Sequence, residues 1–228
     1  MSIATELSNY QTFLTNAYNK CEDKGATIPQ NKNLQNLTAC IDSIPPYTKL
    51  GYIESTGTQY INTGFKATNN TKVEMKLSNF PPISVWAPPF GARTSPSSSD
   101  EYAFYRTDTG LYRSDFSGNR VTFPSGTNLT NETIVTKDGP NTTINGTTIT
   151  NTSATFTATY PLFLCKINDG GTGGHTASLR LYYCKIWDNG TLVRDFIPAK
   201  DNNNVAGLYD KVTKNFYYNQ GTGTFNYG

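Results

Sequence analysis

The sequence is short of the features that mark several large classes of protein. Charged residues make up 16% of the 228 residues and the formal net charge is +2, whereas soluble proteins are usually roughly 25% charged. Lysine and arginine form no basic block, which argues against binding to nucleic acid or to an acidic membrane through bulk charge. No apolar run reaches the roughly 18 residues that a membrane-spanning helix requires. Residues 1–10 contain Glu6 and no apolar segment of the kind found in signal peptides, so we expect synthesis without export.

Side chains suited to metal binding or nucleophilic catalysis are also scarce. The cysteines are Cys21, Cys40, Cys165 and Cys184. They lack the Cys-x-x-Cys spacing of zinc sites, and we expect free, buried thiols because nothing indicates an oxidising compartment. His175 is the one histidine, and it follows the glycine-rich stretch 168–174, which is too flexible to hold a catalytic base. A histidine-based triad is therefore not expected.

Before residue 45, the apolar residues follow a helical period. In the first segment they are spaced alternately by four and three residues, which is the heptad seam of a coiled coil. The seam consists of Ile3, Leu7, Tyr10, Leu14, Ala17 and Cys21. Gly25 and the pair Ile28-Pro29 then end this helix. A second short helix is predicted from about Asn33 to Ile44, before Pro45-Pro46.

Two arrangements of these helices fit the pattern. In one, an αα-hairpin buries the two apolar faces against each other. In the other, the seam joins several copies of the chain into a homo-oligomer, with a trimer preferred. In both, residues 1–44 form a helical attachment or oligomerisation segment, and residues 45–49 form a proline-rich linker.

From residue 47 onward, the pattern is that of β-strands. Residues 71–77 alternate strictly between apolar and charged side chains. Asp138-Gly139-Pro140 and Asp188-Asn189-Gly190 each separate two strand-like runs, which predicts two hairpins. The alternation in residues 179–184 is lost partway, and either a β-bulge or a strand covered on both faces would explain the loss. The spacing of strands and turns predicts a mainly β fold, a two-sheet antiparallel sandwich.

Several segments of residues 50–228 together resemble a known family of domains. They are residues 52–61 (YIESTGTQYI), 90–93 (FGAR), 179–199 (LRLYYCKIWDNGTLVRDFIPA), 205–210 (VAGLYD) and 215–219 (NFYYN). In order, they resemble the opening strand, an early core strand, the long late hairpin and the closing strands of concanavalin A-like lectin/glucanase (laminin-G-like) domains. The resemblance implies a jelly-roll sandwich of two curved sheets over residues 50–228.

The same resemblance implies a role on a virus particle. Domains of this variety are frequent in structural proteins of phages that infect gut bacteria, and residues 1–44 are similar to short modules that precede them in phage fibre and decoration proteins. The resemblance thus implies a virion surface protein, made in the host cytoplasm, whose helices bind other virion proteins and whose sandwich contacts host or mucosal glycans. A purely structural decoration protein without a ligand is the alternative.

Hydrolysis of glycans is a third hypothesis, and the sequence argues against it. Glucanases of similar fold place the string Glu-x-Asp-x-x-Glu on one strand, so that the carboxylates face one cleft. This string does not occur here. Asp100 and Glu101 are adjacent, so on a strand they would point to opposite faces. We therefore expect a protein that is not an enzyme, although a pair of carboxylates from separate strands stays open.

Residues 86–113 combine the side chains that glycan binding requires. Aromatic rings can stack on the C–H faces of sugars, and guanidinium groups can bind hydroxyls. The predicted carbohydrate-binding residues are Trp86, Arg93, Tyr102, Tyr105, Arg106, Tyr112 and Arg113. The alternative is that most of these aromatic side chains belong to the core.

One loop is a candidate for calcium, and no other cofactor is expected. Asn168 and Asp169 offer oxygen ligands, and the glycines that follow them would let backbone carbonyls turn toward an ion. A single carboxylate is few for a divalent cation, so the alternative is a plain hairpin loop.

Overall fold

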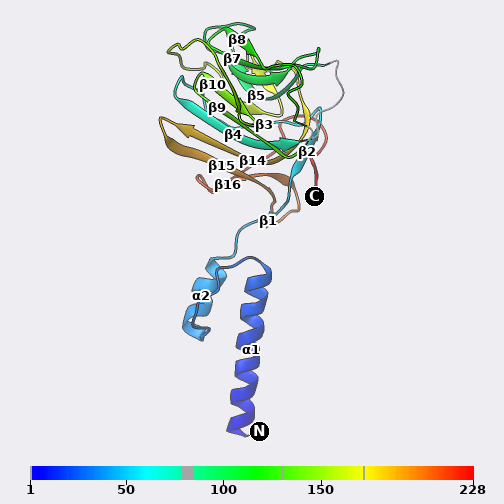
Figure 1. The fold of residues 1–228 in the computed structure, drawn as a ribbon. Helices are drawn as coiled ribbons and strands as arrows, with labels where there is room; N and C mark the ends of the chain where they lie inside the picture. The colour runs from blue at the N-terminus through cyan, green and yellow to red at the C-terminus, as the bar shows by residue number, and fades with distance from the viewer. Residues whose placement is uncertain (1, 79–84, 130, 172) are drawn as a thin grey trace. The chain divides into compact units, whose positions relative to one another are not determined.

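The chain divides into two compact units, Met1–Thr48 and Lys49–Gly228 (Figure 1). The computed structural model describes residues 2–78, 85–129, 131–171 and 173–228. The first unit contains two helices, α1 (Ile3–Asp23) and α2 (Leu34–Asp42), and the second consists of β-strands. Neither helix is long and apolar enough to cross a membrane. The predicted fold class is confirmed: a mainly β sandwich preceded by a short helical segment.

Both helices begin at a side chain that caps them. At the start of α1, Ser2 Oγ accepts a hydrogen bond of 3.2 Å from the backbone N–H of Thr5. At the start of α2, Asn33 Oδ1 accepts one of 2.9 Å from the N–H of Asn36. Each cap satisfies an amide that the first helical turn leaves without a partner. Gly25 follows α1 with φ of +78°, a conformation that glycine adopts without strain.

Helix α2 packs against the C-terminal part of α1. The buried side chains are Tyr18, Cys21 and Cys40, and around them lie Leu14, Ala26, Ile28, Leu37 and Ile44. The Tyr18 hydroxyl donates a hydrogen bond of 2.7 Å to the carbonyl oxygen of Asn33, which ties the two helices together. The αα-hairpin, one of the two predicted arrangements, is therefore present within a single chain.

The N-terminal part of the predicted seam lies outside this hairpin. Ile3, Leu7 and Tyr10 are 88%, 56% and 44% exposed, while Leu14 and Ala17 are half-buried. At the hairpin contact Tyr18 is fully buried in the place predicted for Ala17, because the packed face continues from Leu14 by a step of four residues instead of three. Assembly of several copies through this seam stays a prediction.

The strands of the second unit form two sheets within the described residues. The large sheet consists of β1 (Thr48–Lys49), β2 (Ile53–Thr56), β4 (Thr71–Ser78), β9 (Thr133–Asp138), β10 (Asn141–Ile144), β11 (Thr147–Thr150), β14 (Ser178–Asp188), β15 (Thr191–Lys200), β16 (Ala206–Asp210), β17 (Asn215–Tyr217) and β18 (Asn226–Tyr227). The small sheet consists of β3 (Ile61–Asn62), β5 (Ala87–Arg93), β6 (Tyr102–Arg106), β7 (Tyr112–Phe116), β8 (Asn119–Thr122), β12 (Phe163–Leu164) and β13 (Ile167–Asp169).

The order of the strands places residues from distant parts of the sequence side by side. The main path of the large sheet is β11-β10-β9-β4-β14-β15-β16-β17, and that of the small sheet is β3-β12-β5-β6-β7-β8. Neighbours such as β4 and β14 are antiparallel, whereas β13 runs parallel to β5. Thr48–Lys49, predicted to be part of the linker, forms β1 and pairs with β15.

The turn between β14 and β15 follows from its two residues. Asn189 and Gly190 have φ of +48° and +78°, as a type I′ turn requires at both central positions, and Asn-Gly is the pair that adopts it most readily. The predicted hairpins at residues 138–140 and 188–190 are both present, as β9–β10 and β14–β15.

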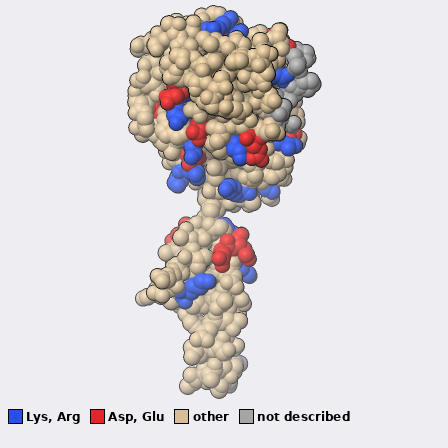
Figure 2. Space-filling model, viewed as in Figure 1, with Lys and Arg blue, Asp and Glu red and all other residues tan. Residues whose placement is uncertain are grey.

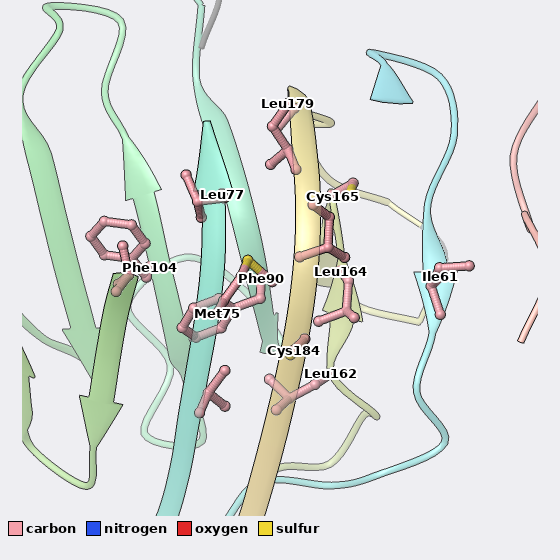
Figure 3. Close-up of a cluster of buried hydrophobic side chains, with 14 of the residues drawn as sticks. Ile61, Met75, Leu77, Phe90, Phe104, Leu162, Leu164, Cys165, Leu179 and Cys184 are labelled. Atoms are coloured by element: carbon pink, nitrogen blue, oxygen red, sulfur yellow. The ribbon is translucent and has the colours of Figure 1, made fainter. Parts of the chain in front are cut away.

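The hydrophobic core lies between the two sheets. Figure 3 shows Met75 and Leu77 of β4 and Cys184 of β14 beside Phe90 and Phe104 of the small sheet. These side chains have no exposed surface. The alternation predicted for residues 71–77 is confirmed, because their apolar side chains point into this core. The cysteines are free, buried thiols, as expected.

One lysine lies inside this core. Lys137 of β9 has no exposed surface, and its Nζ donates a hydrogen bond of 2.6 Å to Ser114 Oγ of β7. Ser114 in turn donates to Asn151 Oδ1 at 2.7 Å. The rings of Tyr102 and Phe116 lie 4.8 and 5.3 Å from Nζ. Burial lowers the pKa of Lys137 to about 7, against the opposing effect of nearby carboxylate charges.

Candidate functional site

The outer face of the small sheet carries a cluster of arginine and acidic side chains, which we call the acid–arginine cluster. It comprises Arg93, Glu101, Arg113, Asp115, Arg120 and Asp169. The alternation along β6 and β7 directs Phe104 and Phe116 into the core, and their neighbours in sequence to this opposite face. Strand pairing therefore brings together charges that are far apart in sequence.

Arg93 and Asp115 are the two centres of the acid–arginine cluster. Arg93 lies 3.0 Å from Glu101 Oε1 through Nη1 and 2.8 Å from Asp169 Oδ2 through Nη2. Asp115 Oδ2 lies 3.1 Å from Arg120 Nε, and the Tyr105 hydroxyl donates a hydrogen bond to the same oxygen. Asp115 Oδ1 lies 2.9 Å from Nε of the neighbouring Arg113, as an ion pair without a hydrogen bond between the two atoms.

Two carboxylates in this cluster are enclosed together. Glu101 and Asp115 have no exposed surface. Burial and the charge of Asp115 raise the pKa of Glu101 to about 7, while the Arg93 guanidinium acts in the opposite direction. Burial is the larger cause. The two carboxylates at the centre of the cluster are therefore enclosed, while Arg120 and Asp169 at its edge are 34% and 22% exposed.

Most of the predicted carbohydrate-binding residues are buried, which corrects that prediction. Tyr102 and Tyr112 belong to the core. Tyr105, Arg106 and Arg93 are 3%, 5% and 7% exposed. A ring or guanidinium group enclosed in this way has no face on which a sugar could stack.

Trp86 and Arg113 are the predicted residues that keep exposed surface. Trp86 is half-buried; the Arg113 guanidinium lies 4.9 Å from its ring centroid. The ring of Tyr105 meets Trp86 edge-on at 5.6 Å, and that of His175 lies 6.3 Å away. These contacts cover much of the indole ring.

Both predicted calcium ligands have partners within the chain. Asn168 is buried: its Nδ2 donates to the carbonyl oxygen of Pro161 at 2.9 Å, and its Oδ1 accepts from the N–H of Gly171 at 3.1 Å. The Asp169 carboxylate forms an ion pair with the Arg93 guanidinium group. Among the described residues, no group of three or more His, Cys, Asp or Glu side chains is arranged to hold a metal ion. Asp169 and Gly173 pair through backbone hydrogen bonds on the two sides of this loop.

The large sheet presents four aromatic side chains on its outer face, which we call the aromatic stripe. They are Tyr52, Tyr182, Tyr183 and Trp187, and each is half-buried. Tyr52 precedes β2 and the other three lie on β14. At about 3.3 Å per residue, the segment from Tyr183 to Trp187 is about 13 Å long. The rings therefore form a row along one strand and onto its neighbour.

A β-bulge creates this row. Pairing of β14 with β4 shifts between Leu181 and Tyr183, so Tyr182 is an extra residue and two consecutive tyrosines reach the outer face. Leu181 and Cys184 still point into the core. The lost alternation in residues 179–184 was the signal in the sequence, and the bulge, one of its two predicted explanations, is confirmed.

Charged side chains of both signs flank the aromatic stripe. Lys72 Nζ lies 4.7 Å from the Trp187 ring centroid, and the Arg180 guanidinium carbon 4.6 Å from that of Tyr52. Tyr183 donates a hydrogen bond of 3.0 Å to Glu74 Oε1. Figure 2 likewise shows basic and acidic side chains interspersed among uncharged ones on the visible face of the second unit. Rings, donors and acceptors thus lie within reach of one ligand.

The comparisons with known proteins bear on the fold. No protein-family model matches the sequence, and no curated protein matches it. Among solved structures, the chain is similar to a candidate carbohydrate-binding protein from Bacteroides ovatus, with a TM-score of 0.52 and 10% sequence identity. The match covers 79% of this chain and 60% of that protein. At this identity the likeness establishes the shared sandwich fold alone.

Proposed function

We propose that the sandwich is a carbohydrate-binding domain and that the aromatic stripe is its binding surface. The observation that carries the proposal is the row of half-buried rings on β14 with hydrogen-bonding groups beside it. Aromatic faces bind the C–H surfaces of sugars, while charged and hydroxyl groups at their edges bind hydroxyls. The similarity to a candidate carbohydrate-binding protein is consistent with this function.

A test compares single substitutions on the two outer faces in the full-length chain. We expect Tyr182→Ala and Trp187→Ala each to weaken binding to glycans captured on an array about tenfold, because each removes one stacking surface, and tenfold corresponds to about 1.4 kcal/mol. Trp86→Ala, on the other face, is the matched control and should bind like the unaltered chain. If Trp86→Ala is the only one of these variants that loses binding, the binding site lies on the small sheet instead. No binding of the unaltered chain to any glycan would leave a purely structural role.

We propose no catalytic role for the acid–arginine cluster. A glycoside hydrolase requires two carboxylates that reach the scissile bond. Glu101 and Asp115 are instead enclosed by guanidinium groups and by the Tyr105 hydroxyl. The network supports a role in holding β5, β6 and β7 in register.

We further propose that the chain is a virion surface protein that assembles through its first helix. In support, α1 exposes Ile3, Leu7 and Tyr10, which lie on one face at heptad spacing. Exposed apolar side chains in a row are costly in water and are typical of a contact surface. In this proposal the helices bind other virion proteins and the sandwich reaches outward to host or mucosal glycans.

Substitution of one seam residue tests the assembly. We expect the full-length chain to have the solution mass of a trimer of its 25.1 kDa protomer, and Leu7→Glu to reduce it to that of a monomer, because a charge cannot be buried in the seam without a partner. Thr12→Glu, at an exposed position of α1 off the seam, is the control. Light scattering of all three proteins at one concentration measures the outcome. A monomeric unaltered chain would contradict the proposal.

A further inference from the structure

An open bowl lies among three turns at one end of the large sheet, two residues beyond Trp187 in the sequence. The bowl has a volume of about 550 Å³, and its walls are residues 69–70, residues 138–141 and residues 189–190. Its size is within the range of about 300–1,000 Å³ of small-ligand sites. The three turns adjoin the same end of β9, β4 and β14, which are neighbours in the sheet, so the bowl is a consequence of the strand order.

Asparagine side chains join two walls of this bowl. Asn70 Nδ2 donates a hydrogen bond of 2.7 Å to Asn189 Oδ1, and Asn69 Nδ2 donates one of 2.8 Å to Asn70 Oδ1. Asp188 Oδ1 accepts from Thr68 Oγ1 at 3.2 Å. These bonds connect the turn before β4 to the turn after β14, and they hold the amide groups in place before any ligand arrives.

The bowl and the aromatic stripe are close together along β14. Trp187 immediately precedes the turn residues 188–190, and in the register of β14 with β4 it lies opposite Lys72. The Lys72 ammonium group lies over the Trp187 ring. Trp187 and Asn189 are two residues apart, at most about 7 Å along the chain, so one glycan of several sugar residues can reach both.

The chemistry of the walls selects the kind of sugar. Carboxamides donate and accept hydrogen bonds, which matches a ring of hydroxyl groups. Among the described residues, the walls include Asp138 and no lysine or arginine. An acidic sugar would place its carboxylate beside Asp138 with no wall cation to neutralise it, a contact that costs free energy.

We propose that the bowl is a subsite for a neutral sugar residue of a glycan whose neighbouring residues stack on the aromatic stripe. The proposal rests on the proposed function of the stripe. It adds the ligand class, neutral glycans in preference to acidic ones. It also adds two residues that determine specificity, Asn70 and Asn189, which line the bowl and are hydrogen-bonded to each other.

The experiment uses the full-length chain and paired probes, neutral gluco-, manno-, galacto- and xylo-oligosaccharides and oligomers of glucuronate and galacturonate. The bowl variant is Asn70→Ala with Asn189→Gly, because glycine tolerates the positive φ of residue 189. Asn203→Ala, in an exposed turn elsewhere, is the control. We expect the unaltered chain and the control to bind a neutral oligosaccharide, and the bowl variant to bind it at least tenfold more weakly with an unchanged melting temperature.

The outcomes separate this proposal from the one on which it rests. If Trp187→Ala weakens binding while the bowl variant binds normally, the aromatic stripe remains the proposed binding surface and the subsite is refuted. Tighter binding of the acidic oligomers than of the neutral ones refutes the ligand class. If no probe binds to the unaltered chain, the proposed function fails and the subsite fails with it. Should the bowl variant melt at a lower temperature, Asn70→Ala alone gives the decisive comparison.

Discussion

Replacing Asp115 with alanine is expected to lower the free energy of unfolding by about 3 kcal/mol. The carboxylate has no exposed surface, and two guanidinium groups and the Tyr105 hydroxyl converge on it. Its removal leaves the half-buried Arg113 beside a cavity with no counter-ion. Relief of the repulsion between Asp115 and Glu101 offsets part of the loss, so we expect the lower end of the range usual for breaking a buried ion pair.

Two further variants serve as comparisons for the stability of Asp115→Ala. Asp115→Asn retains an oxygen for the Tyr105 hydroxyl and should cost less than alanine. Glu132→Ala breaks an ion pair with Lys76 in which the lysine and glutamate side chains are 32% and 52% exposed, and we expect it to cost less than about 1 kcal/mol. Urea denaturation followed by tryptophan fluorescence measures all three. If Asp115→Ala costs no more than Glu132→Ala, the acid–arginine cluster does not stabilise the small sheet.

Replacing Lys137 with methionine is expected to raise the free energy of unfolding, by about 1–4 kcal/mol at pH 6. Among the described residues no carboxylate forms an ion pair with the buried Nζ, whose hydrogen bond goes to Ser114. Methionine fills a similar volume without an amine to desolvate. Ser114 keeps Thr142 and Asn151 as partners, at 2.8 and 2.7 Å, so the substitution leaves no orphaned hydroxyl.

The stabilisation by Lys137→Met should depend on pH in a defined direction. Burial lowers the pKa of Lys137 to about 7 in the folded protein, against about 10.4 in the unfolded chain. Between these values the unfolded state binds more protons, so the stability of the unaltered protein rises with pH in this window. The advantage of the methionine variant should therefore be largest below pH 7 and shrink toward pH 10. A constant difference from pH 6 to pH 9.5 would show that Lys137 keeps its proton in the folded state over this range, and thus that burial does not lower its pKa.

The sequence was sufficient for the fold because local patterns determine its parts. Strict alternation in residues 71–77 determined which side chains of β4 face the core. Asn189-Gly190 specified both the place and the type of the β14–β15 turn. The change from a helical to a strand period near residue 45 separated the helices from the sandwich. Each of these signals acts within a few residues, so no knowledge of distant contacts was needed.

The candidate site could not be predicted in the same way, because burial on a sheet depends on distant elements. Alternation shows that Tyr102 and Tyr105 point to opposite faces of β6, yet both are buried. Tyr102 faces the core, and Tyr105 lies under Trp86 and Arg113, which reach it from other parts of the chain. The aromatic stripe, in turn, depends on where the bulge falls in the pairing of β14 with β4, which the sequence of β14 alone does not determine.

The extra residue at position 182 makes the outer face of β14 independent of its inner face. Deleting Tyr182 would restore strict alternation of inward and outward side chains in β14. Leu181 and Cys184 would still point into the core, and the outer face would carry one ring fewer. A single-codon insertion or loss at this point thus changes the number of rings on the outer face while the packing beneath stays in phase.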